Sequence, residues 1–280
     1  MILIFGRNGQ VAQELARKAP ALRGLGRAQV NLLQPGAAAQ AIADHSPNVV
    51  INASAYTAVD RAETETAEAQ QLNSEAPAEM ARTCAERGIP FLHVSTDYIF
   101  DGSGSLARSE TDPVGPLNVY GHSKLAGEDA VRASGAQALI LRTSWVFSAH
   151  GGNFVKTMLR LSESRDALSI VSDQIGGPTP AADIAATLLT CARAMQAGQA
   201  GGTYHYSGGP AVSWADFARE IFRQAGRHVR VTDIPTADYP TPAARPLNSR
   251  LNCAKLKADF GITQPDWQAG LAATLKELGL

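Results

Sequence analysis

The sequence predicts an α/β protein: a Rossmann-like, doubly wound parallel sheet with a smaller C-terminal α/β lobe. Two observations lead to this prediction. Short apolar runs typical of buried strands alternate with helical stretches through the first half of the chain. The alternation loosens after residue 150, where strands and helices follow one another less regularly. Because βαβ units build parallel sheets with right-handed crossovers, the first half should form the sheet.

The elements of the first half can be placed in order. Strands are expected at 1–5, 21–28, 48–52, 90–95 and 138–144. Helices are expected from the turn at 6–12 to about Lys18, and over 37–44, 61–87 and 120–133. Pro77 lies inside the long 61–87 region and should break or kink it, because proline lacks the N–H that a helix interior needs.

The second half contains fewer clear signals. Helices are expected at 154–161, 182–195 and 214–224, and extended segments at 203–207 and 229–234. Residues 235–247 hold four prolines and should form a loop. We therefore assign residues 1–150 to the sheet domain and 151–280 mainly to the second lobe, with some later segments returning to the sheet.

Composition limits the classes of function. The 280 residues carry a net charge of -1, which argues against nucleic acid as a partner. The three cysteines are far apart in the sequence and form no metal-binding pattern, as expected for free thiols of a reducing compartment. No apolar run is long enough to span a membrane, and no secretory leader precedes the first strand. We expect a cytoplasmic protein.

A glycine turn follows the first predicted strand. Gly6 and Gly9 stand where a backbone must approach a pyrophosphate, and Ala12 is small enough for close helix–strand packing. The N-terminus of the following helix would offer free N–H groups to the anion. This turn predicts a dinucleotide site, so residues 1–150 would form a dinucleotide-binding domain. Arg7 and Arg27 could meet a 2′-phosphate, or they could simply be solvated.

Tyr120 and Lys124 are four residues apart on a predicted helix and therefore share one face. An ammonium beside a phenol should lower the tyrosine pKa from its usual value of about 10, which makes proton exchange feasible. Such a pair is also common as surface decoration. Ser95, Thr96 and Asp97 end a preceding strand, at the edge where parallel sheets bind ligands. The Ser95 and Thr96 hydroxyls could cap the strand end, or a hydroxyl there could donate a hydrogen bond to a reacting carbonyl.

Together these segments resemble the extended short-chain dehydrogenase/reductases, and within them the dTDP-4-dehydrorhamnose reductase family. The resemblance covers nearly the whole chain. The matching segments are 5–11, 52–60, 95–102 (STDYIFDG), 116–128 (PLNVYGHSKLAGE), 142–147, 153–158, 173–179 and 245–251.

The resemblance implies reduction of the 4-keto group of dTDP-4-dehydro-L-rhamnose to dTDP-L-rhamnose, the last step of dTDP-rhamnose synthesis, by NADPH or alternatively NADH. The implied catalytic residues are Tyr120, Lys124 and Thr96. The implied cofactor residues are Gly6, Asn8, Gly9, Gln10, Val11, Asn31, Leu32, Ala53, Ala55, Tyr56 and Thr57, together with Tyr120 and Lys124. The implied substrate residues are Thr96, Asp97, Trp145 and Arg245; Trp145 could instead be a core aromatic. A homodimer is a further expectation.

Two positions depart from the family pattern. The stretch 29–32 lacks the acidic residue that often precedes the adenine contact, which leaves NADH or NADPH open. Glu14 fits a position that holds magnesium in some members, but the segment after Thr179 does not clearly supply a second carboxylate. We predict no catalytic metal, because a phenol can supply the proton for hydride transfer.

Two other functions are considered. An epimerase or dehydratase of the same superfamily would use the same Tyr–Lys pair, although a dehydratase typically has a glutamate where Tyr98 follows Asp97. A non-catalytic regulatory protein, similar to the regulatory subunit of methionine adenosyltransferase, is disfavoured by the intact Thr96, Tyr120 and Lys124.

Overall fold

The computed structural model describes all residues, 1–280. Its centre is a six-stranded sheet in the order β10-β5-β4-β3-β1-β2. The strands are β1 (Ile2–Phe5), β2 (Arg23–Leu25), β3 (Val49–Asn52), β4 (Phe91–Thr96), β5 (Ala138–Thr143) and β10 (Gly202–His205). Every neighbouring pair is parallel. The chain moves outward from β1 in both directions, so a ligand crevice is expected at the carboxyl ends of β1 and β3. The predicted fold class is confirmed.

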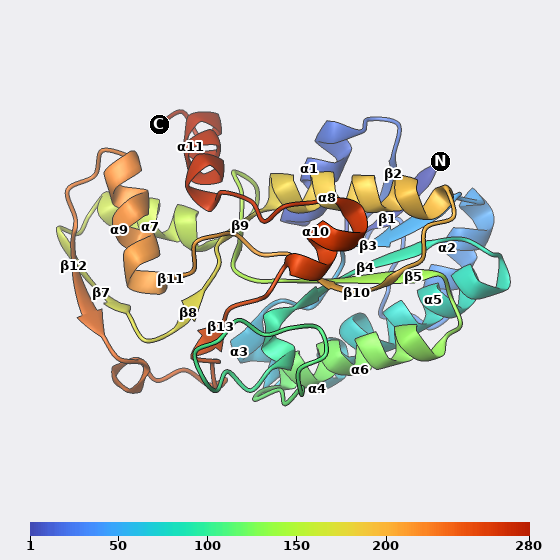
Figure 1. The fold of residues 1–280 in the computed structure, drawn as a ribbon, viewed down its shortest axis with the longest axis horizontal. Coiled ribbons are helices and arrows are strands. Elements are labelled where there is room, and N and C mark those ends of the chain that lie inside the picture. The colour runs from blue at the N-terminus through green and yellow to red at the C-terminus, as the bar shows by residue number, and fades with distance from the viewer.

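Helices cover both faces of this sheet (Figure 1). On one face, α1 (Gln10–Lys18), α8 (Ala181–Gln196) and α10 (Ala254–Phe260) pack against one set of alternating strand residues. On the other face, α2 (Ala37–His45), α5 (Ala76–Glu86) and α6 (Val119–Ala133) pack against the alternate set. Both sets are apolar because each strand is covered on both sides.

The region 61–87 is helical but is not broken or kinked at Pro77 as predicted. It forms α3 (Val59–Ala62), α4 (Thr66–Gln70), a π turn at Gln71–Glu75, and α5. Pro77 stands in the first turn of α5, where a missing N–H is tolerated. The π turn brings Asn73 to the 56 backbone: its Oδ1 accepts from the Tyr56 N–H at 2.8 Å, and its Nδ2 donates to the Ser123 hydroxyl of α6 at 3.0 Å. This widened helical turn thus connects the backbone at Tyr56 to α6 through the Asn73 side chain.

The second lobe has its own apolar core, in which Phe147, Phe217 and Trp267 are almost fully buried. Around it lie α7 (Phe154–Ser162), β7 (Ala167–Val171), α9 (Trp214–Gln224), β12 (Arg230–Ile234) and α11 (Trp267–Glu277). Short strands join this lobe to the sheet: β6 (Val146–Phe147) with β9 (Thr179–Pro180), and β8 (Ile175–Gly176) with β11 (Val212–Ser213) and β13 (Asn248–Ser249).

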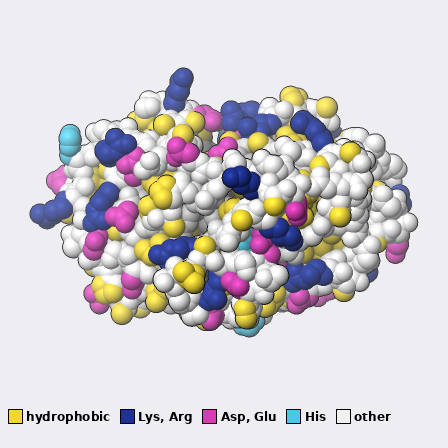
Figure 2. Space-filling view, viewed as in Figure 1, with side chains coloured by type: hydrophobic (Ala, Val, Ile, Leu, Met, Phe, Trp, Pro, Cys, Tyr) yellow, Lys and Arg dark blue, Asp and Glu magenta, His cyan; other side chains and the backbone are white.

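The sequence prediction missed several of these elements. Residues 167–171 form β7, and the C-terminal α10 and α11 were not predicted. Two 3-10 turns occur at Asp97–Ile99 and Thr236–Asp238, the second inside the proline-rich segment predicted as a loop. None of the helices is both long and apolar enough to cross a membrane. On the face in Figure 2, basic and acidic side chains are interspersed rather than gathered by sign.

Candidate active site

A cavity of about 740 Å³ lies at the carboxyl edge of the sheet, between the sheet and the second lobe. It brings together residues that are far apart in the sequence. Among the residues predicted for the site, those lining it are Gly6, Asn8, Gly9, Gln10, Val11, Asn31, Leu32, Ala53, Ala55, Thr57, Thr96, Asp97, Tyr120, Lys124 and Trp145. Its volume falls in the range of small-molecule and cofactor sites.

The glycine turn has the geometry that a pyrophosphate site needs. Gly9 is the N-cap of α1 and no side chain caps the helix, so the N–H groups of its first turn are free of side-chain partners. Gly6 has φ 98, and a Cβ there would lie 2.7 Å from the Ala53 carbonyl oxygen, so only glycine fits. Arg27 also lines the cavity, whereas Arg7 does not and packs beside Gly24. These residues fit a phosphorylated dinucleotide.

Two predicted residues are not placed on the cavity. The Tyr56 side chain is turned away, buried, and its hydroxyl donates to Glu65. Its neighbours Ala55 and Thr57 do line the cavity, whereas Tyr56 is held away from it by Asn73 at its backbone and Glu65 at its hydroxyl. Arg245 is ion-paired with Asp60 at 2.7 Å and also lies outside the lining.

One side of the cavity, which we call the polar wall, consists of Thr96, Asp97, Tyr120 and Lys124 from β4, the following 3-10 turn and α6. Lys124 is only 1% exposed, and its Nζ donates to the Val94 carbonyl at 2.7 Å. Burial lowers the pKa of Lys124 to about 8. The ammonium therefore sits at the base of the wall rather than in solvent.

The electrostatics of Tyr120 differ from the sequence prediction. Burial raises the pKa of the Tyr120 phenol, while the nearby Thr96 hydroxyl partly opposes that shift. The Lys124 Nζ is directed to the Val94 carbonyl, and the pKa of Tyr120 is raised and not lowered. The expectation of a lowered Tyr120 pKa is thus wrong for this arrangement. Tyr120 is a phenol that stays protonated at neutral pH.

Thr96 and Asp97 form one hydrogen-bonded unit. The Thr96 hydroxyl donates to Asp97 Oδ1 at 3.1 Å and accepts from the Tyr98 N–H at 3.2 Å. Asp97 Oδ2 is buried and has no hydrogen-bond partner, and burial raises the pKa of this carboxyl to about 6. The hydroxyl of Thr143, which pairs with Thr96 in the strand register, is likewise buried without a partner and lines the cavity. Buried polar groups of this kind are costly unless a ligand completes their hydrogen bonds.

The other side of the cavity, which we call the aromatic wall, consists of Trp145 and Trp214. Their rings are stacked, with centroids 3.5 Å apart and planes inclined by 10°. Trp145 is half-buried: it packs against the core of the second lobe and also lines the cavity. Its backbone has φ 49, a left-handed conformation that costs a bulky residue on the order of 1–3 kcal/mol. Thr143, Asn153 and Trp214 also line the cavity but were not among the predicted site residues. Thr143 and Asn153 lie in the matching segments 142–147 and 153–158, whereas Trp214 lies outside every such segment.

A separate cluster outside the cavity contains Glu14. Ligand atoms of Glu14, His150 and Glu277 lie within 4.8 Å of one another. Arg17 already forms an ion pair with Glu14 at 2.6 Å. Glu277 lies near the other end of the chain from Glu14, so the sequence contains no local pattern that joins the two carboxylates. This cluster is remote from the polar wall, and the absence of a catalytic metal stays a prediction.

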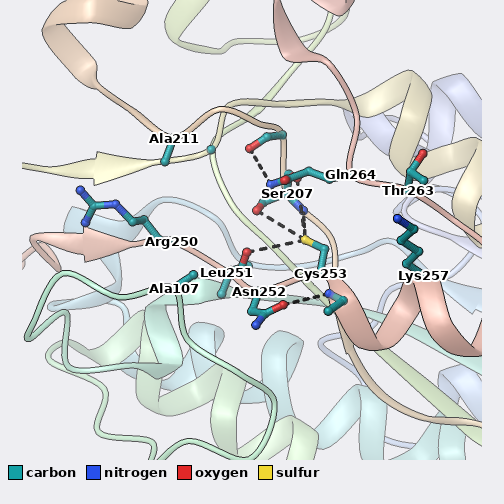
Figure 3. Close-up of a pocket in the computed structure, with 13 residues that line it drawn as sticks. Ala107, Ser207, Ala211, Arg250, Leu251, Asn252, Cys253, Lys257, Thr263 and Gln264 are labelled. Carbon is teal, nitrogen blue, oxygen red and sulfur yellow. Dashed lines mark hydrogen bonds between the residues drawn. The ribbon is translucent and has the colours of Figure 1, made fainter.

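A second cavity of about 550 Å³ is shown in Figure 3. Cys253 lies at its centre, where its Sγ accepts from the Ser207 N–H at 3.3 Å. Burial raises the pKa of this thiol, so it stays protonated and is a poor nucleophile. Arg250 and Lys257 are the charged residues in its lining, and no carboxylate or tyrosine accompanies them. This cavity has no pair of groups suited to proton transfer, so we assign the active site to the first cavity.

A Rossmann-like sheet with a glycine turn and a Tyr–Lys–Thr set at its carboxyl edge defines an oxidoreductase of the short-chain dehydrogenase/reductase type. The family model described as RmlD substrate binding domain matches residues 1–280. The dTDP-4-dehydrorhamnose reductase of Sinorhizobium fredii is 44% identical over 277 residues, covering 95% of this chain and 94% of its own. The chain belongs to the dTDP-4-dehydrorhamnose reductase family, and the resemblance predicted from the sequence is confirmed.

Solved structures agree with this membership. A dTDP-4-dehydrorhamnose reductase from Clostridium acetobutylicum has a TM-score of 0.93 and 34% identity, covering 100% of this chain and 99% of its own. A dTDP-4-dehydrorhamnose reductase from Bacillus anthracis, in complex with NADP, has a TM-score of 0.93 and 32% identity, covering 99% and 98% of the two chains.

Proposed function

We propose that this chain uses NADPH to reduce the 4-keto group of dTDP-4-dehydro-L-rhamnose, giving dTDP-L-rhamnose in the last step of dTDP-rhamnose synthesis. One observation carries the proposal: the glycine turn, the Tyr120–Lys124 pair and Thr96 all line a single cavity. Full-length relatives named as reductases of this substrate support the choice of sugar.

The cofactor would lie across the carboxyl edge of the sheet. Its pyrophosphate would lie at the turn from Gly6 to Val11, and its adenosine near Asn31 and Leu32. Ala53, Ala55 and Thr57 would line the channel toward the nicotinamide. Arg27 is the cation on this path, and its charge favours a 2′-phosphate. The stretch 29–32 lacks the acidic residue that would bind the ribose 2′-hydroxyl of NADH, which also favours NADPH, and NADH is the alternative that the assay below includes. Bound NADPH would supply the hydride.

The polar wall would supply the proton. As hydride reaches C4 of the sugar, the C4–O4 π bond breaks and negative charge develops on O4. The Tyr120 hydroxyl donates its proton to that oxygen, and the Thr96 hydroxyl, turned from Asp97 Oδ1 toward the sugar, donates a hydrogen bond to it. The raised Tyr120 pKa suits this role, because an alkoxide is more basic than a phenolate and draws the proton only when it forms. Lys124 would hold the cofactor ribose from below the wall.

The remaining predicted residues would bind the nucleotide sugar. The unpartnered Asp97 Oδ2 can accept a hydrogen bond from a sugar hydroxyl, and the Trp145 ring can cover an apolar sugar face. Arg245 would reach the diphosphate only by leaving Asp60, to which its guanidinium is now bound. Tyr98, which follows Asp97, is a poor replacement for the glutamate of a dehydratase.

The test is a complete reaction. Purified protein is mixed with enzymatically prepared dTDP-4-dehydro-L-rhamnose and either NADPH or NADH, and the absorbance of the reduced cofactor is followed. We expect the absorbance to fall only when all components are present, with dTDP-L-rhamnose as the product. An epimerase or dehydratase would convert a nucleotide sugar without net consumption of reduced cofactor. Absence of turnover with both cofactors would rule out the reductase.

We further propose that the enzyme works in the cytoplasm and can form a homodimer. The three cysteines are free and buried, in keeping with a reducing compartment. Cell fractionation tests the first statement, and light scattering coupled to size-exclusion chromatography tests the second.

A further inference from the structure

The positive φ of Trp145 must be stabilised by contacts with neighbouring residues. Only Ser46 and Trp145 have positive φ among the residues that are not glycine. Ser46 is the C-cap of α2, where a left-handed residue is ordinary. Trp145 instead stands between β5 and β6, at the edge of the active-site cavity. Strained residues at such positions persist only when their surroundings over-determine them.

Contacts with the segment 176–179 provide part of this stabilisation. The Thr179 N–H donates to the Trp145 carbonyl at 3.1 Å, and the Ser144 hydroxyl donates to the Gly177 carbonyl at 2.9 Å. The indole lies against Gly176, where a Cβ would approach Trp145 Cε2 to 2.7 Å. Glycine is therefore needed at 176 for space, and the segment 176–179 supports Trp145 from the second lobe.

Trp214 provides the remaining contact that stabilises the Trp145 conformation. Its ring stacks on Trp145 almost in parallel, and its Nε1 donates to Gln174 Oε1 at 3.2 Å. Gln174 Nε2 in turn donates to the Thr236 hydroxyl at 3.1 Å. The Trp214 ring also packs on Phe154, with the two ring centroids 4.6 Å apart. Trp214 is thus fixed by a polar chain and an aromatic neighbour before it meets Trp145.

Trp214 does more than fill the core of the lobe. The apolar face of α9 is formed by Phe217, Ala218 and Ile221, which are fully buried. Trp214, the first residue of α9, also packs against this core but is only half-buried, and it lines the cavity. A half-buried indole on the cavity, at the start of a helix whose core residues are fully buried, points to a task in the cavity.

We propose that Trp214 is a positioning residue for the sugar: it holds Trp145 in its strained conformation, so that the Trp145 indole forms the apolar surface for the deoxysugar. The inference rests on the proposed function. A 6-deoxy sugar carries a methyl group and C–H faces that pack well on an aromatic ring. The hydroxyl and carbonyl edges are then left to the polar wall. Without Trp214, Trp145 relaxes to an ordinary φ and the carbonyl is no longer aligned with Tyr120.

The test compares Trp214→Ala, Trp214→Phe, Trp145→Ala and the double variant Trp145→Ala/Trp214→Ala. We expect Trp214→Ala to raise the KM for the sugar about 10-fold, the size of a lost aromatic contact, and to leave the KM for NADPH unchanged. Trp214→Phe keeps a ring beside Trp145 and should recover most of the loss. The double variant should be no worse than Trp145→Ala, because Trp214 acts through Trp145.

A spectroscopic readout separates positioning from loss of structure. The chain has three tryptophans, and two indoles stacked this closely should give an exciton couplet in the far-ultraviolet circular dichroism. The couplet should vanish in Trp214→Ala and in Trp145→Ala. It should persist in Trp267→Phe, the matched control, because Trp267 lies in the lobe core away from the cavity. Trp267→Phe should also keep the wild-type KM for the sugar.

Three results would overturn the proposal: a wild-type protein without the couplet, a Trp214→Ala variant that loses the couplet but keeps the wild-type KM for the sugar, or a double variant whose losses add. If Trp214→Ala does not fold, the KM of Trp214→Phe for the sugar and the couplet of the wild-type protein still decide whether Trp214 positions Trp145. An enzyme that shows the couplet but reduces no sugar would contradict the proposed function instead.

Discussion

The two walls of the active-site cavity are built on different principles. The polar wall rests on fully buried hydrogen bonds and ion pairs: Glu128, on the inner face of α6, accepts from Arg142 at 2.7 Å and from the Ser95 hydroxyl at 2.6 Å. The aromatic wall rests on ring stacking and a strained backbone between the sheet strand β5 and the two-residue strand β6. The polar wall fixes the positions of its hydroxyl, carboxyl and amino groups closely, while the aromatic wall presents an apolar surface. Proton transfer and sugar selection are thus assigned to separate parts of the fold.

Removal of the buried carboxylate should have the largest effect, and it should act on stability. Glu128→Ala leaves Arg142 buried and unpaired, which we expect to lower the free energy of unfolding by about 3–5 kcal/mol. Urea unfolding measures it. Arg132→Ala is the control, since Arg132 also pairs with Glu128 but is 39% exposed and should cost less than about 1 kcal/mol. Equal losses for both variants would show that the polar wall has no special dependence on this buried pair.

Tyr120→Phe should abolish most of the chemistry and little of the binding. We expect kcat to fall on the order of 100-fold or more, because O4 loses its proton donor. Steady-state kinetics and NADPH titration measure the two effects. Tyr98→Phe, which alters a tyrosine whose ring lies 5.5 Å from that of Tyr120, should lose much less. A Tyr120→Phe rate near that of the wild type would remove Tyr120 from this role.

Gly176→Ala tests the aromatic wall from beneath. The added methyl would displace the Trp145 indole, so the KM for the sugar should rise and stability should fall by about 1–3 kcal/mol. Gly115→Ala is the control, because its methyl meets only Asp101 Cβ at 3.5 Å. If Gly176→Ala changed kcat through Tyr120 but not the KM for the sugar, the separation between the walls would fail.

Arg27→Ala lies outside both walls and should affect the cofactor alone. We expect the KM for NADPH to rise about 10-fold while that for NADH changes little, because a charge-assisted bond to the 2′-phosphate is lost. Arg7→Ala should have a smaller effect, since Arg7 does not line the cavity. Initial rates with both cofactors distinguish these outcomes, and equal losses for NADPH and NADH would argue against a phosphate contact.

The smallest effect is expected from pH at Asp97. Burial raises the pKa of this carboxyl to about 6, so it is a carboxylate acceptor above that pH and gains a proton below it. The KM for the sugar should therefore rise as pH falls through about 6. Asp97→Asn should flatten this dependence without changing the KM for NADPH. An unchanged pH profile in Asp97→Asn would assign the titration to another group.

Much of this protein was determined by local sequence. Apolar runs fixed most strand positions, because a strand covered on both faces must be apolar along its length. The glycine turn and the four-residue spacing of Tyr120 and Lys124 are likewise local. Gly6, Gly9, Tyr120 and Lys124 all line the cavity. Helix periodicity places two side chains on one face whatever the rest of the chain does.

Tertiary structure decided what depends on distant partners. Sequence could not show that Lys124 would bond the Val94 carbonyl, that Arg245 would pair with Asp60, or that Tyr56 would turn toward Glu65. The return of some later segments to the sheet was predicted, but sequence could not show that these are α8 and β10, or that Trp214 stacks on Trp145. These contacts join segments far apart in the chain. Their choice depends on packing the whole molecule, because burial and pairing energies are set by the assembled surroundings and not by spacing along the sequence.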